Sequence, residues 1–167
     1  MDAFGPQRAA PPLAKSFSDA EGNQHSIQEA LANGPVLFGI YKSSCAASKV
    51  MLPMLQRIQE KHVADGLTTF GVAQDSPNIT RSFARRYGLD VPLLVEGPDY
   101  PISVGFDIRA TPTVILLRRD GSIAYTTMGF LRDQVEEIEA AVANELGVRP
   151  HRIVDPNESE IPLFVPG

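Results

Sequence analysis

The residue best placed to do chemistry in this sequence is its single cysteine, Cys45. It follows an apolar run at residues 35–41 and a polar turn at 42–44, and it precedes a segment whose apolar residues recur at helical spacing. The free N–H groups and the positive dipole end of a helix stabilise a thiolate. At such positions the pKa of a cysteine falls from about 8.5 to between about 3.5 and 7.5. The pattern therefore predicts a nucleophilic thiol.

The residues around the cysteine also favour a nucleophilic thiol. Lys42 and Lys49 flank it and favour its ionised form. Ser48 follows at i+3, on the same face of the expected helix, where its hydroxyl can donate a hydrogen bond to the thiolate. The alternative is a buried, inert cysteine, because free cysteine commonly packs as a small hydrophobe. Position alone leaves both interpretations open.

Alternating strands and helices must position this thiol. Apolar runs bounded by turns predict five strands, at residues 35–41, 67–73, 91–95, 112–117 and 123–128. Helical periodicity and capping signals predict five helices, at residues 26–33, 46–64, 78–87, 100–106 and 131–146. Pro53 lies inside the second helix and should kink it. Alternation followed by an antiparallel hairpin implies an α/β fold with a mixed sheet between helices.

The chain is long enough for one domain with a sizeable core. We expect a loose lead-in at residues 1–13, a domain at 14–147, and a proline-rich tail at 148–167 that packs on the domain or trails from it. The composition is that of an ordinary globular protein, with 43% hydrophobic and 21% charged residues.

Charge and cysteine content exclude several classes of function. The net charge of -5 argues against a nucleic-acid partner, which needs clustered lysine and arginine. A membrane partner is not expected, since no apolar run approaches the roughly 18 residues of a spanning helix. The N-terminus lacks the apolar core of a signal peptide, which predicts a cytoplasmic protein or a trimmed exported one. One cysteine and three scattered histidines, His25, His62 and His151, predict neither a metal site nor another cofactor.

Residues 42–55, which run Lys-Ser-Ser-Cys-Ala-Ala-Ser-Lys-Val-Met-Leu-Pro-Met-Leu, resemble the active-site helix of redoxins of the TlpA type, relatives of the AhpC/TSA proteins. These carry Cys-x-x-Cys, a basic residue and a helix-kinking proline, matched here by Cys45, Lys49 and Pro53. The Lys-x-Ser-Cys motif and the tail ending in Leu-Phe-x-Pro-Gly are similar to a bacterial redoxin subgroup. The resemblance implies a thioredoxin-like three-layer α/β/α sandwich with a mixed central sheet.

The resemblance extends over residues 14–146. Further matches lie at residues 70–75, 87–92, 106–113 and 119–121, and at Gly129. The stretch 106–113 resembles the one that ends in the family's cis-proline, which would be Pro112. By this resemblance Thr111 and Pro112, together with Ser44, would shape the groove that holds a partner chain.

Three positions depart from the family pattern. Ser48 stands where the resolving cysteine belongs, Ser44 where an aromatic residue is common, and Met51 where an acidic residue is common. A hydroxyl forms no disulfide, so dithiol turnover is not expected, and no buried carboxylate is evident as a proton acceptor. The serine is equally compatible with a natural one-cysteine protein and with a resolving cysteine replaced to trap mixed disulfides.

Three functions are compatible with this pattern. The first is a thiol–disulfide oxidoreductase in which Cys45 and Ser48 act together, with Cys45 forming mixed disulfides with a protein or a small thiol and an external thiol releasing them. The second is a redox-inactive module that binds a partner in the same groove. The third is a one-cysteine peroxidase, which Lys42 weakens because peroxiredoxins have Thr or Ser three residues before the cysteine. The sequence leaves the oligomeric state open.

Overall fold

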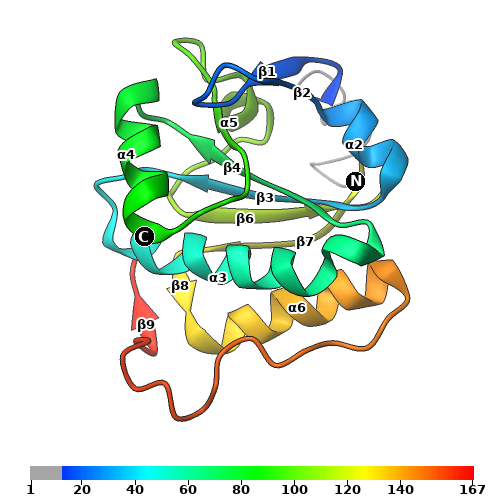
Figure 1. The fold of residues 1–167 in the computed structure, drawn as a ribbon, viewed down its shortest axis with the longest axis vertical. Helices are drawn as coiled ribbons and strands as arrows, with labels where there is room; N and C mark the ends of the chain where they lie inside the picture. The colour runs from blue at the N-terminus through cyan, green and yellow to red at the C-terminus, as the bar shows by residue number, and fades with distance from the viewer. Residues whose placement is uncertain (1–12) are drawn as a thin grey trace.

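A five-stranded mixed sheet forms the centre of the molecule (Figure 1). The computed structural model describes residues 13–167, so nearly all of the expected lead-in at 1–13 lies outside the described residues. The strands are ordered β5-β4-β3-β6-β7. Their bounds are β3 Val36–Tyr41, β4 Thr68–Ala73, β5 Leu93–Val95, β6 Thr113–Leu117 and β7 Ile123–Met128. β3, β4 and β5 are parallel, β6 pairs antiparallel with β3, and β7 pairs antiparallel with β6, which confirms the predicted mixed sheet.

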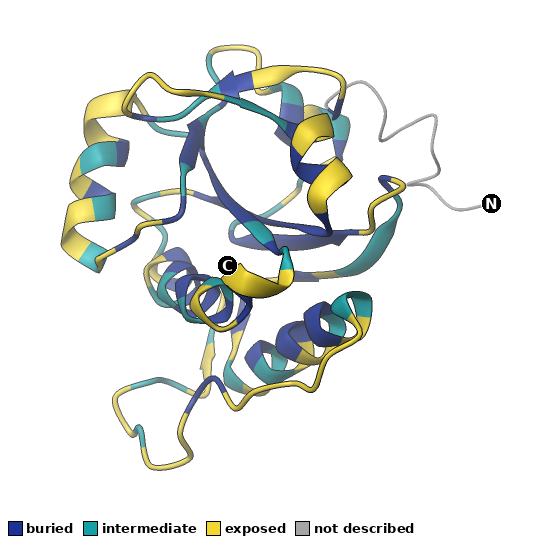
Figure 2. Ribbon diagram, turned by 45° about the vertical axis from the view of Figure 1, so that its right-hand side comes forward, coloured by how far each residue is buried: buried dark blue, intermediate teal, exposed yellow. Residues whose placement is uncertain are grey.

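Helices cover both faces of the sheet (Figure 1). α2, Ile27–Asn33, and α5, Pro101–Gly105, pack on one face, and α3, Ala46–His62, with α6, Arg132–Leu146, on the other. α4, Pro77–Tyr87, adds Phe83 to the core on the α3 side. The side chain of Ser26 caps α2 by accepting from the backbone N–H of Glu29, as its capping pattern predicted. The buried residues lie along the central strands and on the parts of the helices turned toward the sheet (Figure 2).

A pair of glycines lets α3 pack tightly on the centre of the sheet. Gly39 of β3 and Gly71 of β4 are register partners. A β-carbon added to Gly39 would lie 2.5 Å from Cδ1 of Leu55, and Leu52 lies nearby. Because neither strand carries a side chain here, the helix axis comes close to both strands. This packing fixes where α3 begins, just beyond the end of β3.

Two short pairings were not predicted. β1, Ser16–Ser18, and β2, Gln24–Ser26, form a small antiparallel hairpin, and Asp19 closes its turn by accepting from the N–H groups of Glu21 and Asn23. β8, Phe130–Leu131, pairs with β9, Phe164–Val165, near the end of the chain. Strands of two or three residues carry too little periodicity to be recognised in a sequence.

A buried hydrogen-bonded pair joins the far end of α3 to α6. Nε2 of His62 lies 2.6 Å from Oε2 of Glu139, and both side chains are fully buried. The Nδ1 atom of His62 lies 3.1 Å from Oδ2 of Asp65, in the short 3-10 turn η1, Val63–Asp65. Glu139 also accepts from the backbone N–H of His151. The pair therefore ties α3, α6 and the C-terminal segment together.

The C-terminal segment packs along the α3 and α6 side of the molecule. Ile153 and Val154 are buried in the same core as these two helices. Arg57 of α3 makes two 2.9 Å hydrogen bonds with the carboxylate of Glu158. This guanidinium holds the pKa of Glu158 below its ordinary value, and the carboxylate raises the pKa of Arg57. Residues 153–158 are thus anchored by apolar burial and by a bidentate ion pair.

No helix in the described part of the chain is long and apolar enough to cross a membrane. Among residues 13–167, no group of three or more His, Cys, Asp or Glu side chains is arranged to hold a metal ion.

Replacing Glu139 with alanine tests the importance of the buried pair. The change leaves His62 buried without its partner, and it removes the acceptor of the His151 N–H. We expect the free energy of unfolding to fall by about 3 kcal/mol, as is typical when one member of a buried pair is removed. Urea unfolding followed by circular dichroism measures it. Glu137→Ala, on the exposed face of the same helix, should change stability by less than about 0.5 kcal/mol. Equal effects of the two variants would contradict this role.

Candidate functional site

Cys45 is the N-cap residue of α3 and lies at the carboxyl end of β3. Its backbone N–H donates to the carbonyl of Lys42, which closes the turn, and its carbonyl accepts the first helical bond from Lys49. Oδ2 of Asp75, just after β4, accepts from the N–H of Ser43 at 2.8 Å. Hydrogen bonds within the turn and a hydrogen bond to Asp75 therefore hold the turn that carries Cys45.

The loop before β6 faces the thiol. The Thr111–Pro112 peptide bond is cis, and the Cys45 thiol donates to the carbonyl oxygen of Thr111 at 3.3 Å. The two segments are 66 residues apart in the chain. They meet because β3 and β6 are neighbours, with Ile40 paired to Thr113. The sheet thus brings the predicted residues Cys45, Thr111 and Pro112 together.

The environment of Cys45 favours ionisation. Partial burial raises the pKa of its thiol, but hydrogen bonds from the side chain and backbone of Ser48, the Thr111 side chain and the Ala47 backbone lower it by more. The net pKa lies below the ordinary value of a cysteine. Only the protonated thiol can donate to the Thr111 carbonyl, so ionisation breaks that bond and frees the sulfur.

Ser48 lies about one helical turn after Cys45, in α3. Its side chain is fully buried, and its Oγ accepts from the backbone N–H of Lys42 at 3.4 Å. Since this bond uses only a lone pair of the hydroxyl oxygen, the hydroxyl proton is free to point at Cys45. Ser48 therefore links the turn to the thiol through one hydroxyl group.

Lys42, Ser44 and Lys49, which flank Cys45 in the chain, are exposed. The main groups that lower the pKa of Cys45 are hydrogen-bond donors, and neither lysine is among them. The support expected from these two ammonium groups stays a prediction. Ser44, next to Cys45, is available to a molecule that approaches from outside.

The sequence interpretation missed the C-terminal residues beside this site. A β-carbon added to Gly167 would lie 2.5 Å from the carbonyl oxygen of Thr111, the atom that accepts from Cys45. One added to Gly129 would lie 3.5 Å from the N atom of Gly167. Figure 1 shows β9 leading to this place, close to the beginning of α3. The segment has no periodicity that could have signalled the contact.

Buried carboxylates do exist, but they lie elsewhere. Glu139 is at the opposite end of α3, and Glu96 accepts from the backbone N–H and hydroxyl of Ser103. Met51, where related proteins often have an acid, is fully buried in the core. The acidic side chain bonded to the Cys45 turn is Asp75, and it binds a backbone N–H.

Several solved structures share this fold. A Chlorobium tepidum protein assigned as the thiol:disulfide interchange protein DsbE has a TM-score of 0.73 at 18% identity, covering 80% of this chain and 93% of that chain. A secreted Mycobacterium tuberculosis disulfide oxidoreductase homologous to E. coli DsbE has a TM-score of 0.67 at 19% identity, covering 83% of this chain and 98% of that chain. The bacterioferritin comigratory protein of Xanthomonas campestris has a TM-score of 0.71 at 18% identity, covering 82% of this chain and 95% of that chain. These likenesses confirm the predicted thioredoxin-like fold.

Sequence comparison gives a family assignment. No curated protein matches the chain. The sequence profile described as the AhpC/TSA family matches residues 6–126, which is well over half of the chain and includes Cys45, Ser48 and Pro112. The chain therefore belongs to the AhpC/TSA family, in keeping with the resemblance of residues 42–55 to redoxins.

Proposed function

We propose that this protein is a thiol–disulfide oxidoreductase that works through one cysteine. The observation that carries the proposal is the placement of Cys45. Its thiol lies at the N-terminus of α3, faces the cis Thr111–Pro112 loop and has a lowered pKa. A partly accessible thiolate of this kind is the nucleophile of disulfide exchange. The DsbE-type proteins that share the fold carry names of the same activity.

The reaction begins with attack of the Cys45 thiolate on a disulfide of a protein or a small thiol compound. A bond forms between the Cys45 sulfur and one sulfur of the disulfide, the original S–S bond breaks, and the other sulfur leaves as a thiolate. Ser48 stabilises the attacking thiolate by its hydrogen bond. The product is a mixed disulfide, with no change in the total number of disulfide bonds.

The second step needs a thiol from outside the chain. Ser48 occupies the position from which a second cysteine could attack, and the chain has no other cysteine. An external thiolate attacks the mixed disulfide, forms a new disulfide with the partner's sulfur and returns Cys45 as a thiolate. The protein therefore acts where a reducing thiol is supplied.

Peroxide reduction is an alternative outcome. The Xanthomonas campestris relative of the fold is described by its alkyl peroxide reduction activity. Position 42, three residues before the cysteine, is an exposed lysine in this chain and offers no hydroxyl. Rapid loss of the Cys45 thiol with stoichiometric peroxide, together with slow reaction with disulfides, would replace the proposal by this activity.

The pH dependence of alkylation tests the activated thiol. Because the pKa of Cys45 is lowered, its reaction with iodoacetamide should reach half its maximal rate at a lower pH than that of N-acetylcysteine amide. In Ser48→Ala the donor to the thiolate is lost, so the midpoint should move to higher pH. Ser43→Ala, which removes a hydroxyl from the same turn, serves as the control and should leave the midpoint in place. A midpoint for the natural chain at or above that of the reference thiol would overturn the proposal.

Mass spectrometry of the glutathione adduct tests the one-cysteine mechanism. With oxidised glutathione, the natural chain should form a mixed disulfide at Cys45 that persists until dithiothreitol is added. Ser48→Cys should lose the glutathione and form an internal disulfide, because the two sulfurs then lie at i and i+3 of one helix turn. Cys45→Ser should form no adduct. The mechanism is wrong if the natural chain stays unmodified while unfolded protein reacts.

Removal of the last five residues tests whether the tail limits access to the site. Deleting residues 163–167 removes β9 and the contact of Gly167 with the Thr111 loop. We expect Cys45 to be alkylated several times faster at fixed pH in the shortened chain, because one side of the groove is opened. The two chains should react equally fast in denaturant, which controls for reagent and pH. An unchanged rate in the folded state would show that the tail does not restrict the thiol.

A further inference from the structure

A buried serine, Ser103, joins the two segments that meet at Cys45. It is the third residue of α5 and is only 8% exposed. Its hydroxyl accepts from the amide nitrogen of Gln74 at 3.0 Å and donates to a carboxylate oxygen of Glu96. Gln74 directly follows β4, and Glu96 directly follows β5. One hydroxyl group therefore connects α5 to the carboxyl ends of two neighbouring strands.

One arm of this connection leads to the turn that carries Cys45. Gln74 immediately precedes Asp75, whose carboxylate accepts from the backbone N–H of Ser43 at 2.8 Å. The backbone N–H of Gln74 donates to the carbonyl of Tyr41, the last residue of β3. Ser43 lies two residues before Cys45 in the chain. A displacement of Gln74 would therefore move the group that holds this turn.

The other arm leads to the loop that faces the thiol. The carbonyl of Ser103 accepts from the backbone N–H of Ile108 at 2.8 Å, just beyond the end of α5. Two residues separate Ile108 from Thr111, whose carbonyl oxygen accepts from the Cys45 thiol. Because consecutive Cα atoms are only about 3.8 Å apart, this short link restricts how far Thr111 can move while Ser103 stays in place.

Glu96 anchors Ser103 with both of its carboxylate oxygens. One oxygen accepts from the backbone N–H of Ser103 at 2.7 Å and the other from its hydroxyl, and Glu96 itself is buried. Hydrogen bonds to a charged acceptor are among the strongest in proteins. The N–H groups in the first turn of a helix have no partner within the helix, so Glu96 also caps α5.

α5 depends on such an anchor because its backbone is strained on both sides. The helix has five residues, and Tyr100 and Asp107, which lie just before and just after it, have φ angles of 46° and 54°. Residues other than glycine rarely adopt positive φ. They keep it only where the surrounding contacts hold them there. The bonds to Glu96 are therefore needed to keep Ser103 in its place.

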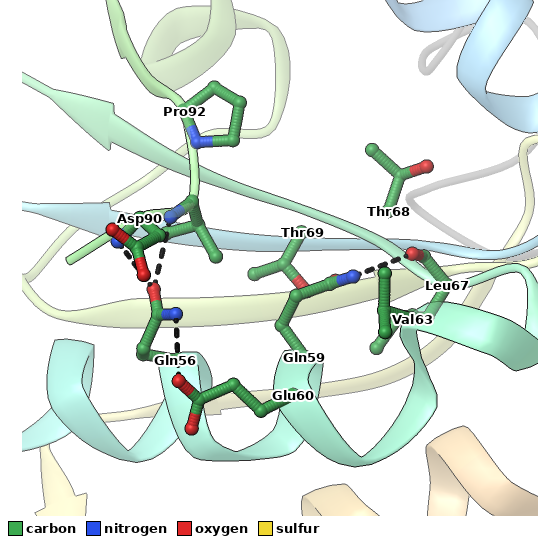
Figure 3. Close-up of a pocket in the computed structure, with 10 residues that line it drawn as sticks. Gln56, Gln59, Glu60, Val63, Leu67, Thr68, Thr69, Asp90 and Pro92 are labelled. Atoms are coloured by element: carbon green, nitrogen blue, oxygen red, sulfur yellow. Dashed lines mark hydrogen bonds between the residues drawn. The ribbon is translucent and has the colours of Figure 1, made fainter.

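The position of Glu96 is in turn fixed by α3. Oε1 of Gln56 accepts from the backbone N–H groups of Asp90 and Val91, at 2.8 and 3.0 Å, in the segment that leads into β5 (Figure 3). At the other end of that strand, the backbone N–H of Glu96 donates to the carbonyl of the last residue of β4. The helix whose first turn holds the thiol therefore also determines where Ser103 lies.

We propose that Ser103 is a positioning residue for the reaction of Cys45. Held by Glu96, it keeps the Thr111 loop against the thiol on one side and, through Gln74, steadies the turn that carries the thiol on the other. It does not act on the sulfur itself. The inference rests on the proposed function, because the reaction that this positioning serves is attack of the Cys45 thiolate on a disulfide.

The pH profile of Cys45 alkylation tests this role. Burial raises the pKa of the thiol, and hydrogen bonds from Ser48 and Thr111 are among those that lower it. Ser103→Ala removes the hydroxyl and loosens both arms, so these donors are held less well at the sulfur. The midpoint of alkylation by iodoacetamide should therefore move to higher pH by about half a unit.

Two further variants separate positioning from simple destabilisation. Gln74→Ala breaks the arm that leads to the turn and should move the midpoint in the same direction. The double variant should behave like Ser103→Ala alone, because both changes break the same hydrogen bond. Ser26→Ala is the matched control, since it removes a hydroxyl that caps α2. It should lower the urea unfolding midpoint, as Ser103→Ala should, but leave the alkylation midpoint in place.

An unchanged alkylation midpoint in a folded Ser103→Ala variant would show that Ser103 only caps α5, and the inference would then be wrong. Where that variant does not fold, the midpoint of Gln74→Ala decides in its place. The redox proposal fails separately. If the natural chain forms no glutathione adduct at Cys45, the one-cysteine mechanism is contradicted, while the expected shift of the alkylation midpoint stays the same.

Discussion

The close packing of α3 on the sheet is the constraint on which the rest of this structure depends. Gly39 and Gly71 stand opposite each other in β3 and β4. The missing side chain of Gly39 leaves room for Leu55 of α3, and Leu52 of the same helix lies against both glycines. A helix pressed against the sheet centre cannot slide or tilt without clashing with the strands. Its first turn is therefore fixed relative to the end of β3, and this places the thiol of Cys45.

Because packing on the sheet fixes the middle of α3, both of its ends have fixed positions, and each end makes its own set of contacts. At the N-terminus, the free N–H groups, the buried hydroxyl of Ser48 and the Thr111 loop surround the thiol. At the C-terminus, His62 and Glu139 form a buried pair that holds α6 and the segment around His151. The tail anchored there returns along the helix to the Thr111 loop. The far end of α3 thus fixes the path of the chain that borders the thiol.

Much of the fold could be predicted from the sequence, because the central strands are continuous apolar runs and the longer helices carry clear periodicity and caps. The position of Cys45 at a helix start followed from the same pattern. Its hydrogen bond to Thr111 did not, since it depends on β3 and β6 being neighbours in space. The contact of Gly167 with that loop left no local signal at all. Such features arise from tertiary packing alone.

A site with one cysteine constrains how the protein would release a mixed disulfide. In a dithiol site the second sulfur limits the lifetime of the mixed disulfide, whereas here Ser48 can stabilise the thiolate but cannot attack. The hydrogen bond that activates Cys45 as a nucleophile also makes it a better leaving group, because a lower pKa favours departure. An external thiol would then break the mixed disulfide readily, whereas no group of the chain itself can break it. The lifetime of the adduct would be set by access to the groove, which the residues beside Thr111 border on one side.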